Sequence, residues 1–111
     1  MKRYEMIKSK ELFNSIIKNG NKNKNDSYII FYTKSENYKP NFGLAVSKKM
    51  GNSVIRNKIK RQIRNIIDNN KLLFKNNYNY IIMVRKDFIN NNYKVNEELM
   101  IDLIRKVKYE K

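Results

Sequence analysis

Residues 47–67 read S-K-K-M-G-N-S-V-I-R-N-K-I-K-R-Q-I-R-N-I-I, and they combine an apolar helical pattern with a strongly charged one. At about 100° per residue, the isoleucines gather on one side of a helix. They are Ile55, Ile59, Ile63, Ile66 and Ile67. The spacing therefore predicts a helix from Val54 to about Asp68 that packs through its isoleucines. Before it, Gly51 is suited to a positive φ, and Asn52 or Ser53 is suited to cap the first turn.

The same stretch carries positive charge without any negative charge. It holds seven Lys and Arg residues and no Asp or Glu, and the acid-free window extends from Asn37 to Ile67. Opposite the isoleucines lie Asn57, Lys60, Arg61 and Arg64, with Lys58 beside them and Arg56 near the boundary. Three of the six Arg residues of the chain fall within the nine positions 56–64. The planar donor fork of Arg matches phosphate. The helix is therefore expected to present a cationic face to an anionic partner.

The whole chain has the charge of a protein that binds polyanions. Its 111 residues suffice for one domain (1–111) with its own core, and 25 Lys and Arg against 10 Asp and Glu give a net charge of +15. Lys and Asn are frequent throughout, as in proteins of A/T-rich genomes, so the clustering of Arg is the more informative sign. The N-terminal residues lack an apolar leader segment, and no apolar run approaches the roughly 20 residues of a membrane span. We therefore expect a soluble, cytoplasmic protein.

The remaining segments predict an α+β fold. Helices are expected at 9–18, at 54–68 and from Asn96 onward, and strands at 28–33, 42–47 and 80–84. We expect the first two strands to form an antiparallel hairpin, residues 19–26 to form a loop, and strand 80–84 to be buried on both faces. The order α-β-β-α-β-α, with one optional strand after the second, indicates a two-layer α/β sandwich.

Several side chains have expected positions within these elements. Four apolar residues of the first helix are expected to pack on the core: Leu12, Phe13, Ile16 and Ile17. Gly20 is suited to a left-handed cap after this helix. Alternation along strand 28–33 places Tyr28, Ile30 and Tyr32 on one face, and Ile29 and Phe31 on the other. Asn96 is expected to cap the last helix, with Glu97 and Glu98 in its first turn.

Protein-side catalysis has little support in this sequence. The chain has no His and no Cys, so the usual imidazole base, thiol nucleophile and thiolate metal site are all missing. The ten acidic residues are scattered, and no glycine-rich phosphate loop occurs among only three Gly residues. Lys48 and Lys49, before a helix N-terminus with free N–H groups, suit phosphate binding instead.

The run G-L-A-V-S-K-K-M-G-N-S-V-I-R-N-K-I-K-R-Q-I-R, residues 43–64, resembles the signature of the protein subunit of bacterial ribonuclease P. It combines a strand end, a glycine turn and a basic helix in one contiguous stretch. K-E-L-F-N-S-I-I-K-N-G (10–20) resembles the first helix of that family, and Y-I-I-M-V-R-K (80–86) resembles its last strand. The resemblance therefore covers essentially the whole chain.

The resemblance implies a role in removing the 5′ leader of precursor tRNA. In this ribonucleoprotein the RNA subunit is the catalyst and uses Mg²⁺, so no catalytic residue, metal site or bound cofactor is expected in the protein. The expected partners are the catalytic RNA and precursor tRNA, with no membrane and no obligate protein partner. The family fold is a sandwich whose β-α-β unit crosses over left-handedly, against the usual right-handed rule.

The resemblance also assigns site residues. The expected RNA-binding residues are Lys48, Lys49, Asn52, Arg56, Asn57, Lys58, Lys60, Arg61, Arg64 and Arg85. The expected cleft for the leader of precursor tRNA consists of Phe13, Ile17, Ile29 and Phe31, with Phe31 and Tyr32 as alternatives at the last position. Two residues depart from the family pattern. Ile17 stands where an aromatic residue is common, and Lys58 stands where a second Arg is common, which loses a bidentate donor.

Two other classes of function share these features. A non-enzymatic RNA-binding protein of ribosomal type would have similar size, charge and fold class. A basic protein that binds membrane surfaces or compacts DNA would share the charge. An assay distinguishes a ribonuclease P subunit from these two alternatives. A ribonuclease P subunit is expected to restore cleavage of precursor tRNA by a ribonuclease P RNA at low Mg²⁺.

Overall fold

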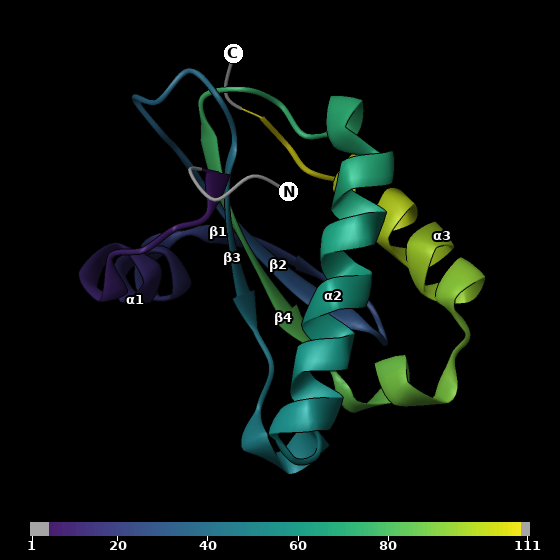
Figure 1. The fold of residues 1–111 in the computed structure, drawn as a ribbon. Helices are drawn as coiled ribbons and strands as arrows, with labels where there is room; N and C mark the ends of the chain where they lie inside the picture. The colour runs from purple at the N-terminus through teal and green to yellow at the C-terminus, as the bar shows by residue number, and fades with distance from the viewer. Residues whose placement is uncertain (1–4, 110–111) are drawn as a thin grey trace.

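The computed structural model describes residues 5–109, which form three helices around a four-stranded sheet (Figure 1). The helices are α1 (Lys10–Asn19), α2 (Ser53–Asn69) and α3 (Tyr93–Arg105). The strands are β1 (Asn21–Lys24), β2 (Tyr28–Lys34), β3 (Asn41–Ala45) and β4 (Tyr78–Val84). Single 3-10 turns are η2 (Lys48–Met50), η3 (Lys71–Leu73) and η4 (Lys86–Asn90). The α+β class expected from the sequence is confirmed.

The sheet separates two apolar layers of unequal size. Helices α2 and α3 cover one face, and α1 packs on the other (Figure 1). The larger core lies under α2 and α3 and contains the alternate side chains Tyr28, Ile30 and Tyr32 of β2, as the alternation predicted. From α2 it receives Ile59, Ile63, Ile66 and Ile67, and from α3 Met100, Leu103 and Ile104.

Strand β4 occupies the centre of the sheet, whose order is β1-β2-β4-β3. It runs antiparallel to β2 and parallel to β3, and it is buried on both faces, as predicted. The predicted hairpin of strands 28–33 and 42–47, which are β2 and β3 in the structure, is therefore wrong, because β4 lies between them. The chain leaves β3, returns through α2 and enters β4, and this crossover is left-handed (Figure 1), against the usual rule.

Two further expectations for the first half of the chain are wrong. Residues 21–24 form the edge strand β1, which pairs with β2, and are not a loop. Gly20 has an extended backbone with φ of −75° and is not a left-handed cap. Its small size is needed for another reason, because a Cβ atom there would stand 2.5 Å from the carbonyl oxygen of Ile16.

Helix α3 begins one turn earlier than expected. The Oδ1 of Asn92 accepts a hydrogen bond from the N–H of Val95 at 2.9 Å, so Asn92 and not Asn96 is the cap. Asn96 is buried within the helix, where its side-chain amide donates to the carbonyl of Phe88 at 3.0 Å. The hydroxyl of Tyr28 donates to the Asn96 carbonyl at 2.9 Å. A buried amide must find such partners, and here they join α3 to β2 and η4.

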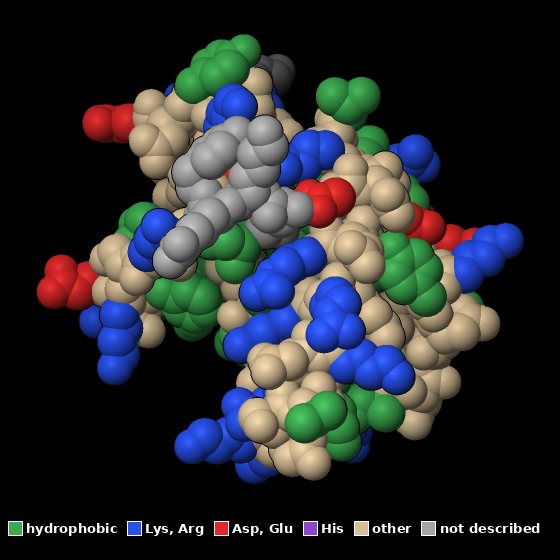
Figure 2. Space-filling model, viewed as in Figure 1, with side chains coloured by type: hydrophobic (Ala, Val, Ile, Leu, Met, Phe, Trp, Pro, Cys, Tyr) green, Lys and Arg blue, Asp and Glu red, His purple; other side chains and the backbone are tan. Residues whose placement is uncertain are grey.

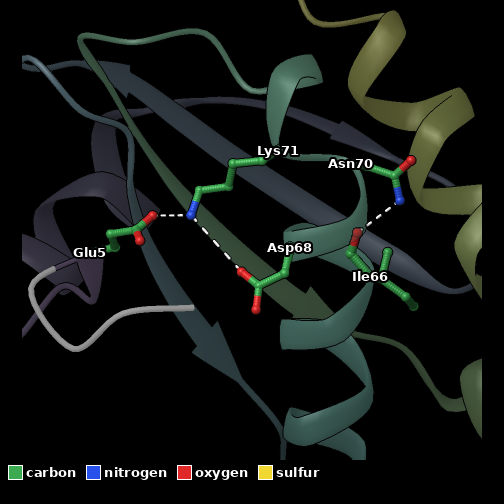
Figure 3. Close-up of polar contacts among 5 residues, drawn as sticks. All are labelled: Glu5, Ile66, Asp68, Asn70 and Lys71. Atoms are coloured by element: carbon green, nitrogen blue, oxygen red, sulfur yellow. Dashed lines mark hydrogen bonds and ion pairs between the residues drawn. The ribbon is translucent and has the colours of Figure 1, made fainter.

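The end of α2 is tied to the N-terminal segment. The N–H of Ile7 donates to the carbonyl of Phe42 at 2.8 Å, which lays this segment along β3. Glu5 is 6% exposed and forms an ion pair with Lys71, whose Nζ lies 3.9 Å from Oδ1 of Asp68 (Figure 3). The side chain of Asn70 donates to the carbonyl of Ile66 at 2.8 Å, which satisfies one of the last carbonyls of the helix (Figure 3).

Two side chains assigned to the core from their spacing are exposed instead. Leu12 on α1 is 41% exposed, and Ile55 on α2 is 43% exposed. Both belong to the first turn of their helix, where the apolar stripe has not yet reached the sheet. Spacing identifies a helix side, but it does not show how far along the helix the neighbouring layer extends.

Candidate nucleic-acid interface

A tight turn positions the start of α2 against the end of β3. Gly51 has φ of +146°, a region that favours glycine, as expected from its place before the helix. The Oδ1 of Asn52 then accepts the N–H of Ile55 at 3.0 Å, which confirms Asn52 as the cap. Within η2, the Oγ of Ser47 accepts the N–H of Lys49 at 3.2 Å. This turn leaves Lys48 and Lys49 exposed beside the helix N-terminus.

The face of α2 that points away from the sheet is cationic. Asn57, Lys58, Arg61 and Arg64 are exposed, while Arg56 and Lys60 are half-buried at the edges of this face. Figure 2 shows Lys and Arg side chains gathered along α2. Because no Asp or Glu occurs between Asn37 and Ile67, the helix itself supplies no counter-charge before Asp68. Such a surface attracts phosphates by charge before any specific contact forms.

Three of the expected RNA-binding residues have side-chain atoms that are hydrogen-bonded within the protein or buried. Asn52 caps α2, so its side-chain oxygen is already engaged. The Nη1 of Arg85 donates to the carbonyl of Asn25 at 2.8 Å, which joins the end of β4 to the turn before β2. The Nε of Arg56 is buried and has no hydrogen-bond partner among the described residues.

The four expected cleft residues lie together on the other face of the sheet. Phe13 and Ile17 of α1 and Ile29 and Phe31 of β2 belong to one apolar cluster, whose buried centre also holds Ile16 and Ile81. Phe31 faces this cluster, whereas Tyr32 points into the larger core. Phe31 is only 8% exposed, while Phe13, Ile17 and Ile29 are half-buried. Phe31 therefore belongs to the buried part of the cluster, and the other three residues form its accessible part.

Sequence reasoning missed three residues of this face. Strand pairing places Lys24, Ile29, Met83 and Ala45 in one row across the four strands. Ile29, Met83 and Ala45 are half-buried, and Lys24 is exposed at the edge. Alternation in β4 puts Met83 on the same face as Ile81, but nothing in the sequence shows that β4 pairs with both β2 and β3. The row becomes visible only once the register is known.

Lys60 connects the two candidate surfaces. It lines a shallow pocket of about 350 Å³ together with Ala45, Ser47 and Met83. Ala45 and Met83 belong to the apolar row, while Lys60 belongs to the edge of the cationic face of α2. The apolar row and the cationic surface therefore adjoin at the C-terminal ends of β3 and β4.

Among residues 5–109, no group of three or more acidic side chains lies close enough to hold a metal ion. Burial raises the pKa of Tyr28 and of Tyr80 far above the ordinary tyrosine value, so both hydroxyls stay protonated even in alkaline solution. Within the same residues, no helix is both long and apolar enough to cross a membrane. The two surfaces offer exposed cations on α2 and partly buried apolar side chains beneath α1.

Comparison with known proteins gives a consistent match. A family model described as Ribonuclease P matches residues 1–108. The ribonuclease P protein component of Mycoplasma capricolum is 38% identical over 109 residues, which cover 97% of this chain and 100% of that protein. The corresponding component of Mesoplasma florum is 35% identical over 105 residues, which cover 94% and 96%.

Solved structures agree in fold. The ribonuclease P protein of Thermotoga maritima superposes with a TM-score of 0.86 at 23% identity, over 95% of this chain and 99% of that one. The ribonuclease P protein of Staphylococcus aureus superposes with a TM-score of 0.83 at 26% identity, over 91% and 93%.

Proposed function

Because this chain belongs to the ribonuclease P protein family, we propose that α2 binds the catalytic RNA while the face beneath α1 binds the 5′ leader of precursor tRNA. As a protein component of ribonuclease P, the chain functions in the maturation of tRNA 5′ ends. Family membership also implies association with ribonuclease P RNA. The division of labour between the two surfaces is the proposal, and a cytoplasmic location is proposed with it because the proposed substrate is made there.

One observation carries this division. The cationic face of α2 and the apolar row meet at Lys60, so two different surfaces adjoin at the C-terminal ends of β3 and β4. The cationic face has charge and donors but little apolar surface, which suits the backbone of a folded RNA. The apolar row offers a floor for unstacked bases, which suits a single strand.

The leader is proposed to lie across the sheet beside α1. Its bases would rest on Ile29 and Met83, with Phe13 and Ile17 forming the wall on the helix side. Base stacking on aromatic residues contributes roughly 1–3 kcal/mol per base and tolerates sequence changes. Since Ile17 is not aromatic, Phe13 is the only ring offered by the four expected cleft residues that is not deeply buried.

The protein assists catalysis through its charge. The catalytic RNA and its substrate are both polyanions, so their approach requires neutralisation by Mg²⁺ or by protein cations. The Mg²⁺ ions of the reaction are proposed to be held by the RNA, because the described residues offer no cluster of protein ligands. A protein with a net charge of +15 lowers the Mg²⁺ concentration at which precursor and catalytic RNA associate.

Reconstitution tests this function directly. A bacterial ribonuclease P RNA is assayed at low Mg²⁺ with a precursor tRNA, with and without the protein. We expect the protein to restore 5′ processing, and we expect a larger gain for a precursor with a leader of several nucleotides than for one with a single-nucleotide leader. Cleavage at the rate of the RNA alone, with protein shown by circular dichroism to be folded, would contradict the proposal.

A further inference from the structure

A small apolar pocket lies at the other edge of the cationic face, between the first turns of α2 and η4. Its volume is about 220 Å³. Ile59 and Phe88 line it and are 5% and 2% exposed, so they form its floor. Ile55 and Ile89 line it and are 43% and 52% exposed, so they form its mouth. Scattered apolar side chains on a surface are ordinary, but here the two exposed isoleucines flank one apolar cavity.

The rim of this pocket is polar and includes a cation. Lys58, Gln62 and Asn91 complete the lining, and no acidic residue is part of it, although Asp87 belongs to η4. The side-chain amide nitrogen of Asn91 donates to the Oγ of Ser27 at 3.1 Å and to the Oδ1 of Asn96 at 3.3 Å. Within residues 5–109, the Asn91 Oδ1 is then left as an acceptor. Figure 2 shows hydrophobic side chains at the lower end of α2, directly below the row of Lys and Arg.

We propose that this pocket holds an unpaired base of the catalytic RNA, with Lys58 on the adjoining phosphate. A base has apolar faces and a polar edge, and the pocket offers isoleucines for the faces and two amide groups for the edge. Charge complementarity selects nucleic acid, because the only charged residue in the lining is a lysine. The pocket borders the face proposed to bind the RNA subunit, on the side away from Lys60, and this favours the RNA subunit over the leader. The inference thus rests on the proposed function of α2.

Affinity and its salt dependence distinguish a base contact from a phosphate contact. We expect the double variant Ile55→Ala/Ile89→Ala to bind the catalytic RNA about tenfold more weakly, with an unchanged slope of log affinity against log salt. Lys58→Ala is expected to make the slope shallower by about 0.7–0.9. The matched control is Leu72→Ala/Val95→Ala, which removes two other exposed apolar side chains and is expected to change neither quantity.

Ile55 also packs near Gly51, so folding of the double variant is checked by thermal melting, and Ile89→Ala alone provides a second test.

Replacing Ile89 with a diazirine analogue of leucine gives a direct readout in the assembled holoenzyme. A photocross-link to an unpaired nucleotide of the RNA subunit supports the proposal. A cross-link to precursor tRNA or to protein, or affinities for both isoleucine variants equal to the control, overturns it. If Arg61→Ala and Arg64→Ala also leave RNA binding unchanged, the proposed role of α2 fails as a whole.

Discussion

Gly43 lies on β3 beneath α1, where a Cβ atom would stand 2.7 Å from Cε2 of Phe13 and 3.3 Å from Cγ1 of Ile81. The absence of a side chain at this position lets the ring of Phe13 rest on the sheet. Gly43 therefore allows the close packing of α1, through Phe13, on the sheet. Its effect is steric, since an added methyl group would force the ring or the helix to move.

Gly43→Ala is accordingly expected to lower the free energy of unfolding by about 1–3 kcal/mol, the usual cost of overpacking. In a Phe13→Leu background the same change is expected to cost less, because the clashing ring is gone. Urea unfolding of the four proteins of this double-mutant cycle measures the coupling. Equal costs of Gly43→Ala in both backgrounds would show that Phe13 does not determine the fit.

Buried tyrosines make the stability sensitive to alkaline pH. Burial raises the pKa of Tyr28 and Tyr80 above the unfolded value near 10, so the folded state retains protons that the unfolded state loses. The stability they contribute is complete below about pH 10 and declines as the pH rises further. Each of the two is expected to remove about 1.4 kcal/mol per additional pH unit.

Urea unfolding at pH 8, 10 and 11 checks this expectation. Tyr28→Phe is expected to lose less stability between pH 10 and 11 than the parent protein, even though it is less stable at pH 8, since it lacks the hydrogen bond to the Asn96 carbonyl. Tyr38→Phe, at a position that is 72% exposed, is the matched control. An identical alkaline decline in all three proteins would rule out Tyr28 as its source.

Among the elements, α2 was the one most fully predicted from sequence. Its bounds, its cap and four of its five packing isoleucines agree with the spacing, because all of these depend on neighbours within a few residues. Strand β4 was recognised, but its neighbours were not. Two apolar faces show that a strand is buried, yet they do not show which strands flank it, and a long helix between β3 and β4 permits a parallel pairing.

The cationic face of α2 leads to a prediction about RNA affinity. Arg61→Ala and Arg64→Ala are each expected to weaken binding of ribonuclease P RNA and to reduce the salt slope by about 0.7–1 for each phosphate that is no longer neutralised. Both side chains are exposed, so thermal stability should stay within about 0.5 kcal/mol of the parent protein. Filter binding across a series of salt concentrations measures the slopes.

The matched control is Arg105→Ala, an exposed arginine in the last turn of α3 that lies outside the cationic face. It removes the same charge from the whole protein but not from α2. If Arg105→Ala reduces affinity and slope as strongly as Arg61→Ala, then total charge and not the face of α2 determines RNA binding.

For the whole molecule, the net charge predicted a polyanionic partner. The alternation of side chains along β2 predicted which residues face each apolar layer. The apolar row was not predicted. Lys24, Ile29, Met83 and Ala45 are contributed by four strands separated by up to 59 positions along the chain. Only hydrogen-bond register brings them into line, and register follows from long-range pairing that local patterns do not encode. Phe31 and Tyr32 were alternatives for a different reason, because the family resemblance across the preceding Asn-rich loop fits with a shift of one residue. The structure places Phe31 in the cluster beneath α1 and Tyr32 in the larger core.

The proposed leader site predicts different effects for substitutions in the apolar row and for substitutions at the buried position beneath it. Met83→Ala and Ile29→Ala are expected to weaken holoenzyme binding of a precursor with a leader about three- to tenfold and to leave mature tRNA binding unchanged. Phe31→Ala, at a buried position, is expected to cost about 3–5 kcal/mol of stability. Equal losses for precursor and mature tRNA in the Met83 variant would place the leader elsewhere.

The central position of β4 also determines the order in which the sheet can be completed during synthesis. While the chain emerges from the ribosome, β1 and β2 can pair and the N-terminal segment can bond to β3, but β3 lacks its partner strand β4 until residues 78–84 are available. Until then β2 and β3 each present an open edge, and open edges are where growing chains associate wrongly. A chain that stops between α2 and β4 can pair only β1 with β2 within the sheet, so we expect premature termination there to yield a product that proteases degrade.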